Sequence, residues 1–516
     1  MNSENEITKL DGTKTRFIVK GIIVGAVVGI VISLFRVLVE EVFQWVIRGY
    51  VLMQEQPLWL IPWTVVSLLV ALFVGKLIAS EPNIKGSGIP QVEGQLHGQL
   101  EMNWFSVLWK KFVGGVLSIG SGLFLGREGP SIQLGAVVAQ GLSKKLGQTK
   151  SEEKILISSG ASAGLAAAFN APIAGLLFVL EEIHHSFSPL IWLTSFSAAI
   201  TANFVSLHFF GLTPVLFLGE IEKLPLGYYW MLPVLGVFLG VAGWVYQQVL
   251  LSLPKIYGKL PKLSPNYYGM IPFLLIIPIG LIAPQFLGGG SQIVFYLAEA
   301  SLGILFLLGI FALRFVFSMI SYGSNLPGGI FLPILSLGAI LGAIYGMILH
   351  YTLGVEIHFV KNFIIFSMAG YFAAIGKAPL TAMVLVTEMV GNLTHLMSIG
   401  VVVLFSYIVV DYLGGKPIYE TLLERIVRPD FVDISGRKTI IEYPVDSTGG
   451  FDERMVRDID WPEDMLLTSI RRGEKELLTH GDTLILGGDT LIILTDSGIS
   501  QKIKVELQAK EQLTYC

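Results

Sequence analysis

The stretch GLFLGREGPSIQLG, Gly122 to Gly135, places two opposite charges, Arg127 and Glu128, between glycines and a proline in an otherwise apolar run. A charged side chain at membrane depth costs about 2.5 to 3.5 kcal/mol on insertion scales, so it indicates a function. The composition supports membrane depth: of 516 residues, 53% are hydrophobic and 14% are charged, against about 25% charged in soluble domains. The sequence therefore predicts a protein that crosses the membrane several times, with a functional carboxylate inside it.

The rest of the composition limits the alternatives. A net charge of −4 gives no basis for a nucleic-acid partner, and one cysteine, Cys516, excludes an intramolecular disulfide. The apolar run from Phe17 to Ile47 is longer than a signal-peptide core of roughly 7 to 15 residues, so residues 1–16 precede a retained first membrane helix. Basic residues mark the cytoplasmic loops and place both ends of the membrane region on the cytoplasmic side: Lys9, Lys14, Arg16, Lys144, Lys145, Lys150, Lys154, Lys255, Lys259, Lys262, Arg425 and Arg428.

Two internal matches indicate a duplicated membrane region. PSIQLGA at 130–136 resembles PILSLGA at 333–339, an offset of 203 positions. GLAAAFNAPIAGLLFVLEE from Gly164 resembles GYFAAIGKAPLTAMVLVTEM from Gly370, with an offset of 207 that aligns Glu181 with Glu388. Chance could explain one match between apolar helices, but two in register favour repeats at about 17–215 and 226–415. Runs interrupted by glycine and proline predict broken helices, whose irregular backbone must be buried in protein or line a cavity.

Three motifs share a design that suits an anion: GSGIP at 86–90, GREGP at 126–130 and GGIFLP at 328–333. In each, glycines precede a proline, which is favoured in the first turn of a helix. A helix N-terminus presents free N–H groups and a partial positive charge. Three such ends aimed at one point would hold an anion without a full positive charge, and so weakly enough to release it.

These motifs, together with GGKPIY at 414–419, closely resemble the four signature regions of the CLC family of chloride channels and chloride/proton exchangers, over roughly residues 17–428. The resemblance implies an all-α polytopic fold of two inverted-topology repeats with broken helices. It also implies a homodimer with one anion pathway per subunit. A prokaryotic-type member is expected to lie among the lipids of the plasma (inner) membrane as a multi-pass protein with cytoplasmic N- and C-termini.

Carried over by motif, the resemblance assigns roles to individual residues. The hydroxyls of Ser87 and Tyr419 and the backbone N–H groups of Ile330 and Phe331 are expected to bind chloride. Glu128 is expected to be both the gate and a proton carrier, because a carboxylate can occupy an anion site at a helix N-terminus until it is protonated. The remaining motif positions support the site: Gly86, Gly88, Pro90, Gly126, Arg127, Gly129, Pro130, Gly329 and Pro333. Lys111 and Arg127 are interpreted as supporting charges rather than chloride ligands.

A second proton site is expected at the pair Glu181 and Glu182. The family pattern makes Glu182 the internal proton acceptor, while Glu181 and Glu388 are interpreted as a buried, hydrogen-bonded structural pair. A solvated carboxylate at a helix end is the alternative for Glu182. Because family channels usually carry an apolar residue at this position, Glu182 favours an exchanger.

The function predicted is therefore electrogenic Cl⁻/H⁺ antiport, without enzymatic activity, metal or resident cofactor. The first alternative is a passive voltage-gated chloride channel, and a fluoride/proton antiporter ranks below it. An intramembrane serine protease built on Ser87 or Ser121 would need a neighbouring histidine, and none of the eight histidines pairs recognisably with either serine.

The composition changes after Arg428, where short strands and frequent charges predict a small cytoplasmic α/β domain at 435–510. Gly487 and Gly488 are expected to form a hairpin turn between two strands. The run LLTSIRRGEKELLTHGDTLILGGDTLIIL resembles the C-terminal domain of TrkA/RCK-type potassium-transport regulators. That resemblance implies a regulatory nucleotide or cyclic dinucleotide, whose phosphates could meet Arg471 and Arg472. A dimer-stabilising module with a solvated arginine pair is the alternative.

Overall fold

The computed structural model divides the chain into two compact units, Met1–Glu424 and Arg425–Cys516. The structure describes residues 2–185, 188–260, 264–299, 302–427, 438–446, 449–473, 475–496 and 499–512. Lys262, Arg428, Cys516 and residues 435–437, which the sequence analysis used, lie outside the described residues.

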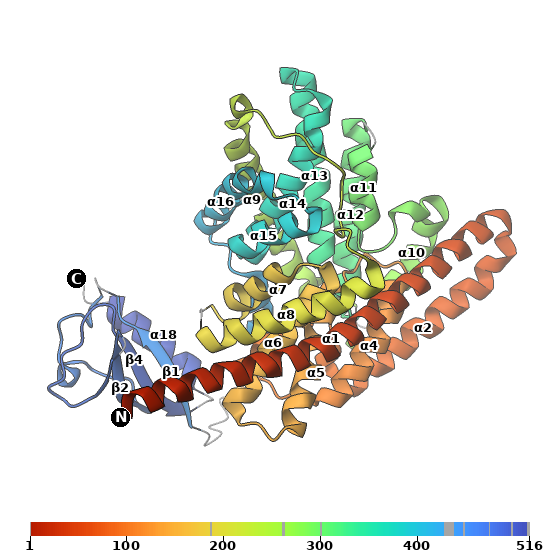
Figure 1. Ribbon diagram of the computed structural model, residues 1–516. Coiled ribbons are helices and arrows are strands. Elements are labelled where there is room, and N and C mark those ends of the chain that lie inside the picture. The colour runs from red at the N-terminus through yellow and green to blue at the C-terminus, as the bar shows by residue number, and fades with distance from the viewer. Residues whose placement is uncertain are drawn as a thin grey trace. The chain divides into compact units, whose positions relative to one another are not determined.

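The first unit is helical (Figure 1). Its α-helices are α1 (Asn2–Glu55), α2 (Leu60–Ser80), α3 (Ile89–Leu96), α4 (Trp104–Gly120), α5 (Glu128–Lys145), α6 (Lys150–Phe169), α7 (Pro172–Phe178), α8 (Pro189–Phe210), α9 (Met231–Tyr257), α10 (Met270–Ile282), α11 (Ser291–Glu299), α12 (Ile304–Gly323), α13 (Phe331–Leu353), α14 (Val360–Gly376), α15 (Pro379–Val390), α16 (Leu396–Tyr412) and α17 (Ile418–Ile426). Within the described ranges, nine helical segments are long and apolar enough to cross a membrane. The prediction of a polytopic helical membrane protein is confirmed.

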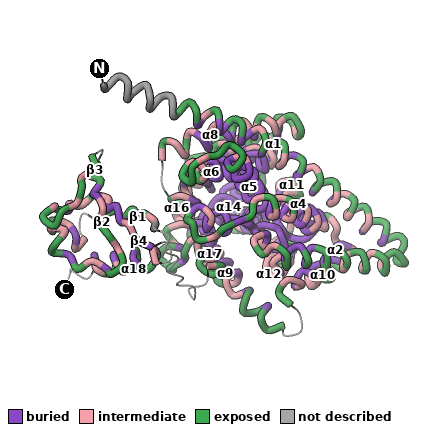
Figure 2. Tube along the Cα trace, turned by 90° about the horizontal axis from the view of Figure 1, so that it is seen from below, coloured by how far each residue is buried: buried purple, intermediate pink, exposed green. Residues whose placement is uncertain are grey.

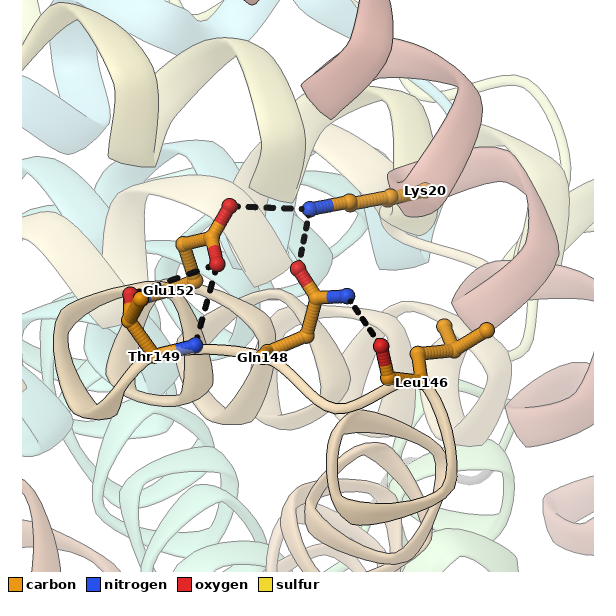
Figure 3. A network of polar contacts seen from close by, with 5 residues as sticks. All are labelled: Lys20, Leu146, Gln148, Thr149 and Glu152. Atoms are coloured by element: carbon orange, nitrogen blue, oxygen red, sulfur yellow. Dashed lines mark hydrogen bonds and ion pairs between the residues drawn. The ribbon is translucent and has the colours of Figure 1, made fainter.

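The first helix is longer than a bilayer requires. Helix α1 has 54 residues and continues through residues 2–16, whereas about 20 residues cross the hydrocarbon core. Near its start, buried Lys20 forms an ion pair of 3.1 Å with Glu152 and a hydrogen bond with Gln148 (Figure 3). Glu152 also closes a capping box with Thr149 at the start of α6. This network fixes α1 to the connection between α5 and α6.

The helix boundaries repeat with the offsets found in the sequence. Helix α5 begins at Glu128 and α13 begins 203 positions later, at Phe331. Helices α6 and α14 end 207 positions apart, and each is followed by a left-handed residue, Asn170 or Lys377. Helices α7 and α15 also begin 207 positions apart. The duplication is therefore a repeat of three-dimensional structure.

Each half also caps a helix of the other half. The carboxylate of Glu388 accepts hydrogen bonds from the N–H groups of Ile173 (3.2 Å) and Ala174 (2.8 Å) in the first turn of α7. The carboxylate of Glu181 accepts equivalent bonds at the start of α15, including one of 2.7 Å from the N–H of Thr381. Negative charge is favourable at a helix N-terminus. The hydrogen-bonded pair is confirmed, but both carboxylates are half-buried rather than fully buried.

The helices that carry the motifs lie in the centre of the first unit. In the most apolar windows of α13 and α14, 89% and 94% of residues are buried, against 17% in α2. Figure 2 shows the same concentration of buried residues around α5 and α14. The irregular backbone at the helix starts is therefore enclosed by protein, as a membrane requires.

The second unit is a four-stranded antiparallel sheet with one helix. The strands are β1 (Lys438–Pro444), β2 (Met465–Arg472), β3 (Lys475–Leu478) and β4 (Thr490–Asp496), in the order β1-β4-β2-β3. Helix α18 (Ser500–Gln512) contributes Ile503 and Leu507 to a core that includes Ile441, Ile470, Leu491 and Ile493. The predicted small α/β domain is confirmed.

The predicted hairpin at Gly487 and Gly488 is wrong. The segment before these glycines pairs with an earlier loop instead of with β4, because the N–H of Ile485 donates to the carbonyl of Arg454 (2.9 Å). The N–H of Gly487 donates to the side chain of Asp452 (2.6 Å), which turns the chain away from the sheet. Gly487 and Gly488 do form a tight turn, in which the N–H of Asp489 donates to the carbonyl of Leu486 (3.0 Å), but it does not join two paired strands. The turn that joins the paired strands β2 and β3 contains Gly473 with φ of 61°.

Two arginine–carboxylate pairs brace this sheet. Arg471 forms a bidentate pair with Glu442 (3.0 and 3.1 Å), and Arg472 forms one with Asp489 (2.7 and 2.8 Å). Burial alone would raise the pKa of Asp489, but hydrogen bonds from Arg472 and from the Leu486 N–H outweigh it and hold that pKa below its ordinary value. Both guanidinium groups are thus engaged within the domain, which does not favour phosphate binding by this pair.

We expect Arg472→Met to lower the unfolding free energy of the C-terminal unit by about 2 kcal/mol at neutral pH, since hydrogen bonds to charged groups contribute about 1.5 to 3 kcal/mol. The side chain of Asp489 is only 2% exposed and would lose its partner. A depressed carboxylate pKa stabilises the folded state above the unfolded value, so the difference from the unsubstituted protein should shrink as pH falls below 3.8. Hydrogen exchange of β2 and β4 in the full-length protein measures both effects.

The matched control is Arg471→Met. Its pair with Glu442 is exposed on both sides, at 45% and 55%, so we expect a loss of about 0.5 kcal/mol or less. Equal losses for the two substitutions, or a difference that does not depend on pH, would contradict the role assigned to the Arg472–Asp489 pair.

Candidate functional site

The three glycine motifs meet in one place. Gly126 and Gly329 exchange two backbone hydrogen bonds, each of 2.7 Å, as an isolated antiparallel bridge. The N–H of Gly328 donates to the carbonyl of Gly86 (3.0 Å), which joins the first motif to the third. The first and second motifs also touch, because a Cβ on Gly129 would lie 2.7 Å from the Cβ of Ser87. The structure thus brings together motifs that are more than 200 residues apart.

Each motif opens a helix, as predicted. Helices α3, α5 and α13 begin at Ile89, Glu128 and Phe331, and the motif prolines lie in their first turns. The first N–H groups of a helix have no acceptor within that helix. Next to these ends, Ser87 is 1% exposed and its hydroxyl oxygen accepts from the N–H of Ile89 (3.3 Å). Backbone donors from α3, α5 and α13 therefore surround the meeting point of the loops.

Lys111 braces this region without being free to bind an anion. Its side chain, on α4, is fully buried, and Nζ donates to the carbonyls of Ile84 (2.9 Å) and Gly86 (2.7 Å). Gly86 has φ of 59°, in the left-handed region that favours glycine. The ammonium group thus holds a strained loop in place, which agrees with its predicted supporting role.

Glu128 is the first residue of α5 and has no exposed surface. Its carboxylate lies against Gly126 and near the N–H of Leu332 at the start of α13, without a hydrogen bond of ordinary geometry to any described residue. The positive charges of Arg127 and Arg36 act on it. Burying a polar group without a hydrogen-bond partner costs free energy. The position of Glu128 therefore suits a carboxylate that exchanges one partner for another.

Tyr419 lies in the first turn of α17, where it is 1% exposed. Its hydroxyl has no hydrogen-bond partner in the described part of the chain. Its ring meets Phe178 edge-on at 6.4 Å, and Phe178 contacts Phe331 at 6.2 Å. Phe331 also packs on Phe372 at 4.3 Å. The free hydroxyl is therefore held by a rigid aromatic wall that includes a predicted anion-site residue.

Glu182 lies in a short π-helical turn, Val179–Ile183, that follows α7. It is 4% exposed, and its Oε1 has no hydrogen-bond partner among the residues described. The charges of both Glu182 and Glu128 act on the hydroxyl of Tyr419, so Tyr419 lies within electrostatic reach of both carboxylates. Single π-helical turns are frequent at functional sites. The structure therefore groups the predicted gate, the predicted anion ligands and the predicted inner proton site.

The sequence analysis missed several residues of this region. The hydroxyl of Tyr322 on α12 would lie 3.4 Å from a Cβ on Gly86 and approaches Ser87. Nothing local in the sequence marked Tyr322. Arg36 on α1 and Glu93 on α3 are also buried charges. Arg36 stands in an apolar run, which was a usable signal, whereas Glu93 stands among polar residues.

This arrangement suits anion binding and proton transfer. Neutral donors surround the meeting point of the loops, and two buried carboxylates lie within reach of it. Among the described residues, no group of three or more His, Cys, Asp or Glu side chains could hold a metal ion.

Comparison with known proteins agrees with this description. The family model "Voltage gated chloride channel" matches residues 63–411, and the "TrkA-C domain" model matches residues 440–507. The H(+)/Cl(-) exchange transporter ClcA of Salmonella arizonae is 34% identical over 418 residues, which are 78% of this chain and 88% of that protein. The corresponding transporter of Citrobacter koseri is 33% identical over 417 residues, with the same coverage.

Solved structures share the fold. A slow cyanobacterial Cl⁻/H⁺ antiporter has a TM-score of 0.76 and 32% identity, and the match covers 80% of this chain and 98% of that one. A eukaryotic CLC transporter matches in fold with a TM-score of 0.67 and 20% identity, covering 79% of this chain and 74% of its own. The chain therefore belongs to the voltage gated chloride channel family, and its C-terminal segment is similar to a TrkA-C domain.

Proposed function

We propose that this protein exchanges chloride for protons across a membrane. The observation that carries the proposal is a pair of buried carboxylates, Glu128 and Glu182, whose charges both act on Tyr419. Both oxygens of Glu128 and the Oε1 of Glu182 lack hydrogen-bond partners among the described residues. A chloride channel needs a gate but no second proton site. The exchange transporters of Salmonella arizonae and Citrobacter koseri, both at least 33% identical, support antiport further.

Chloride binds where the three loops meet. The hydroxyls of Ser87 and Tyr419 and the N–H groups of Ile330 and Phe331 donate to it. All four donors are neutral, and the adjacent Lys111 is engaged by backbone carbonyls. An ion in transit must be bound well enough to enter and weakly enough to leave, and neutral donors meet both requirements.

Glu128 couples the two ions. As a carboxylate it competes with chloride for the N–H groups at the start of α13, and as a neutral acid it gives up that position. Protonation therefore opens the anion site, and the same proton is available for transport. Glu182 receives or supplies that proton at the other end of the route. Because exchange moves net charge, a membrane potential of 100 mV biases it by about 2.3 kcal/mol per elementary charge.

The alternatives have less support. A CLC-type fluoride/proton antiporter matches with a TM-score of 0.62 but 21% identity, which indicates a shared fold alone. A serine protease would need a histidine in contact with Ser121 or Ser87. The hydroxyl of Ser121 instead donates to the carbonyl of Leu117, and that of Ser87 accepts from the N–H of Ile89. The histidine–serine contact that the structure contains, at 2.6 Å, joins His184 to Ser158 instead.

The same proposal covers assembly and location. We place the protein as a homodimer in the plasma (inner) membrane, with a membrane domain at 17–428 whose termini are cytoplasmic. The C-terminal domain at 435–510 is a regulatory module for a nucleotide or cyclic dinucleotide. Because Arg471 and Arg472 are paired with carboxylates, such a ligand would be held by other residues.

The direct test is proton movement in liposomes that contain the purified protein, driven by a chloride gradient with the potential clamped by potassium and valinomycin. We expect protons to move against their own gradient. Chloride flux without coupled protons would instead establish a channel.

We expect Glu128→Gln to retain chloride flux and to reduce proton flux to that of protein-free liposomes, because the amide cannot carry a proton or compete as an anion. Parallel chloride-electrode and pH recordings on the same vesicles measure both fluxes. Coupled proton transport that survives this substitution would refute the gate assignment.

We expect Glu182→Gln also to remove proton flux, whereas Glu181→Gln should keep the proton-to-chloride ratio and lose about 1 to 2 kcal/mol of stability through weaker bonds to α15. Glu388→Gln is the symmetry-matched control and should resemble Glu181→Gln. If Glu181→Gln uncouples the fluxes and Glu182→Gln does not, the two glutamates have been assigned the wrong way round.

A further inference from the structure

Glu182 has little direct access to water on which a proton could arrive. The residue is 4% exposed, and its Oε1 is buried without a hydrogen-bond partner in the described ranges. If Glu182 is the inner proton site, as the proposed function requires, a series of groups that reaches bulk water would supply it with protons.

Acidic side chains of two neighbouring helices surround this carboxylate. The charges of Glu93 on α3 and Glu420 on α17 act on Glu182, together with that of its neighbour Glu181. The charges of Glu420 and Glu424 in turn act on Glu93. Glu182, whose Oε1 lacks a hydrogen-bond partner among the described residues, thus lies among carboxylates whose charges act on it, and one of these, Glu93, is itself 2% exposed.

The packing of α3 on α17 explains why these carboxylates are close. Gly94 lies so near α17 that a Cβ there would be 2.7 Å from Cδ1 of Leu423. Glu93 precedes Gly94, and Leu423 stands between Glu420 and Glu424. Residues four apart lie on one face of a helix, so Glu420 and Glu424 form a column one turn long.

Exposure falls in steps along this set. Glu424 is exposed, Glu420 is half-buried, and Glu93 and Glu182 are buried. Exposure therefore decreases from Glu424 at the surface to Glu93 and Glu182 in the interior, and each of the four side chains is a carboxylate that can accept and release a proton.

Two other titratable groups near Glu182 in the sequence are engaged elsewhere. Glu181 is engaged by the N–H groups of Leu380 and Thr381. His184 contacts Ser158, and the charges that act on it are those of His97, His185 and Lys154 rather than that of Glu182.

We propose that protons reach Glu182 through Glu424, Glu420 and Glu93, so that the face of α17 bearing the two glutamates is the inner proton entrance. In each step an O–H bond of one carboxylic acid breaks and an O–H bond forms on the next carboxylate, directly or through water, so no other reactant is consumed. The negative charge of the entrance also repels chloride, which keeps the proton route separate from the anion route. This inference rests on the proposed function.

The test measures proton and chloride fluxes in liposomes for Glu420→Gln/Glu424→Gln and for Glu93→Gln. We expect chloride flux to remain and the proton-to-chloride ratio to fall at least about tenfold, since a positioned proton-transfer group contributes about 10² to 10⁴ in rate. Glu420→Asp, which keeps a carboxylate at this position, should retain most of the proton-to-chloride ratio of the unsubstituted protein. A purely structural role would lower both fluxes together and leave their ratio unchanged.

Glu153→Gln is the matched control, because Glu153 is a half-buried carboxylate at the start of α6 whose charge is not among those that act on Glu182. The proton-to-chloride flux ratio of Glu153→Gln should equal that of the unsubstituted protein. If Glu93→Gln fails to fold, the double variant at the more exposed positions still decides the question.

The outcomes separate this inference from the proposed function. If the unsubstituted protein exchanges ions and Glu182→Gln uncouples it, but the Glu93 and Glu420/Glu424 variants keep the normal ratio, the entrance is elsewhere and this inference is overturned. If the unsubstituted protein moves no protons, the proposed antiport itself fails.

Discussion

The two hydrogen bonds between Gly126 and Gly329 are the constraint on which the rest of the membrane unit depends. They join equivalent positions of the two repeats, and their reciprocal geometry is what a twofold relation between the halves produces. Because each glycine lies two residues before a helix start, the bridge sets α5 and α13 with their N-termini side by side. A Cβ on Gly126 would lie 2.3 Å from Oε2 of Glu128. The carboxylate proposed as the gate therefore lies over the seam between the halves, near the N–H of Leu332.

Three buried cations of this unit are engaged by backbone carbonyls. Lys111 binds the carbonyl of Gly86, Arg36 binds that of Ala167 (2.6 Å), and Arg314 binds that of Gly288 (2.8 Å). The repeats differ at one such place: the carbonyl of Ala374, equivalent to Ala167, is met by the neutral side chain of Gln247. At this pair of equivalent positions only the first repeat carries a positive charge, that of Arg36, which acts on Glu128. Arg36 therefore adds attraction for an anion while the protein backbone engages its guanidinium group.

The sequence was sufficient where the information was local or repeated. Motif prolines predicted helix starts, and the 207-position offset marked Glu181 and Glu388 as an equivalent, hydrogen-bonded pair. That each carboxylate bonds to the opposite half was not predicted. The sequence was insufficient where long-range contacts decide the outcome. Nothing near Tyr322 indicates that its ring reaches the loop of Ser87. The pair Gly487 and Gly488 has the composition of a hairpin turn. However, Ile485 and Gly487 form hydrogen bonds to a loop more than 30 residues earlier in the chain, and these bonds prevent the preceding segment from pairing with β4.

Helix α17 shows how two ions can share a gate and still leave by different routes. Tyr419 and Glu420 are adjacent, and successive residues of a helix differ in direction by about 100°. Tyr419 faces the aromatic wall with Phe178, whereas Glu420 acts on Glu93 and Glu182. In the proposed mechanism, the anion route and the proton route therefore diverge at a single peptide unit. A rotation of α17 would change both proposed routes together, because the two side chains share one backbone.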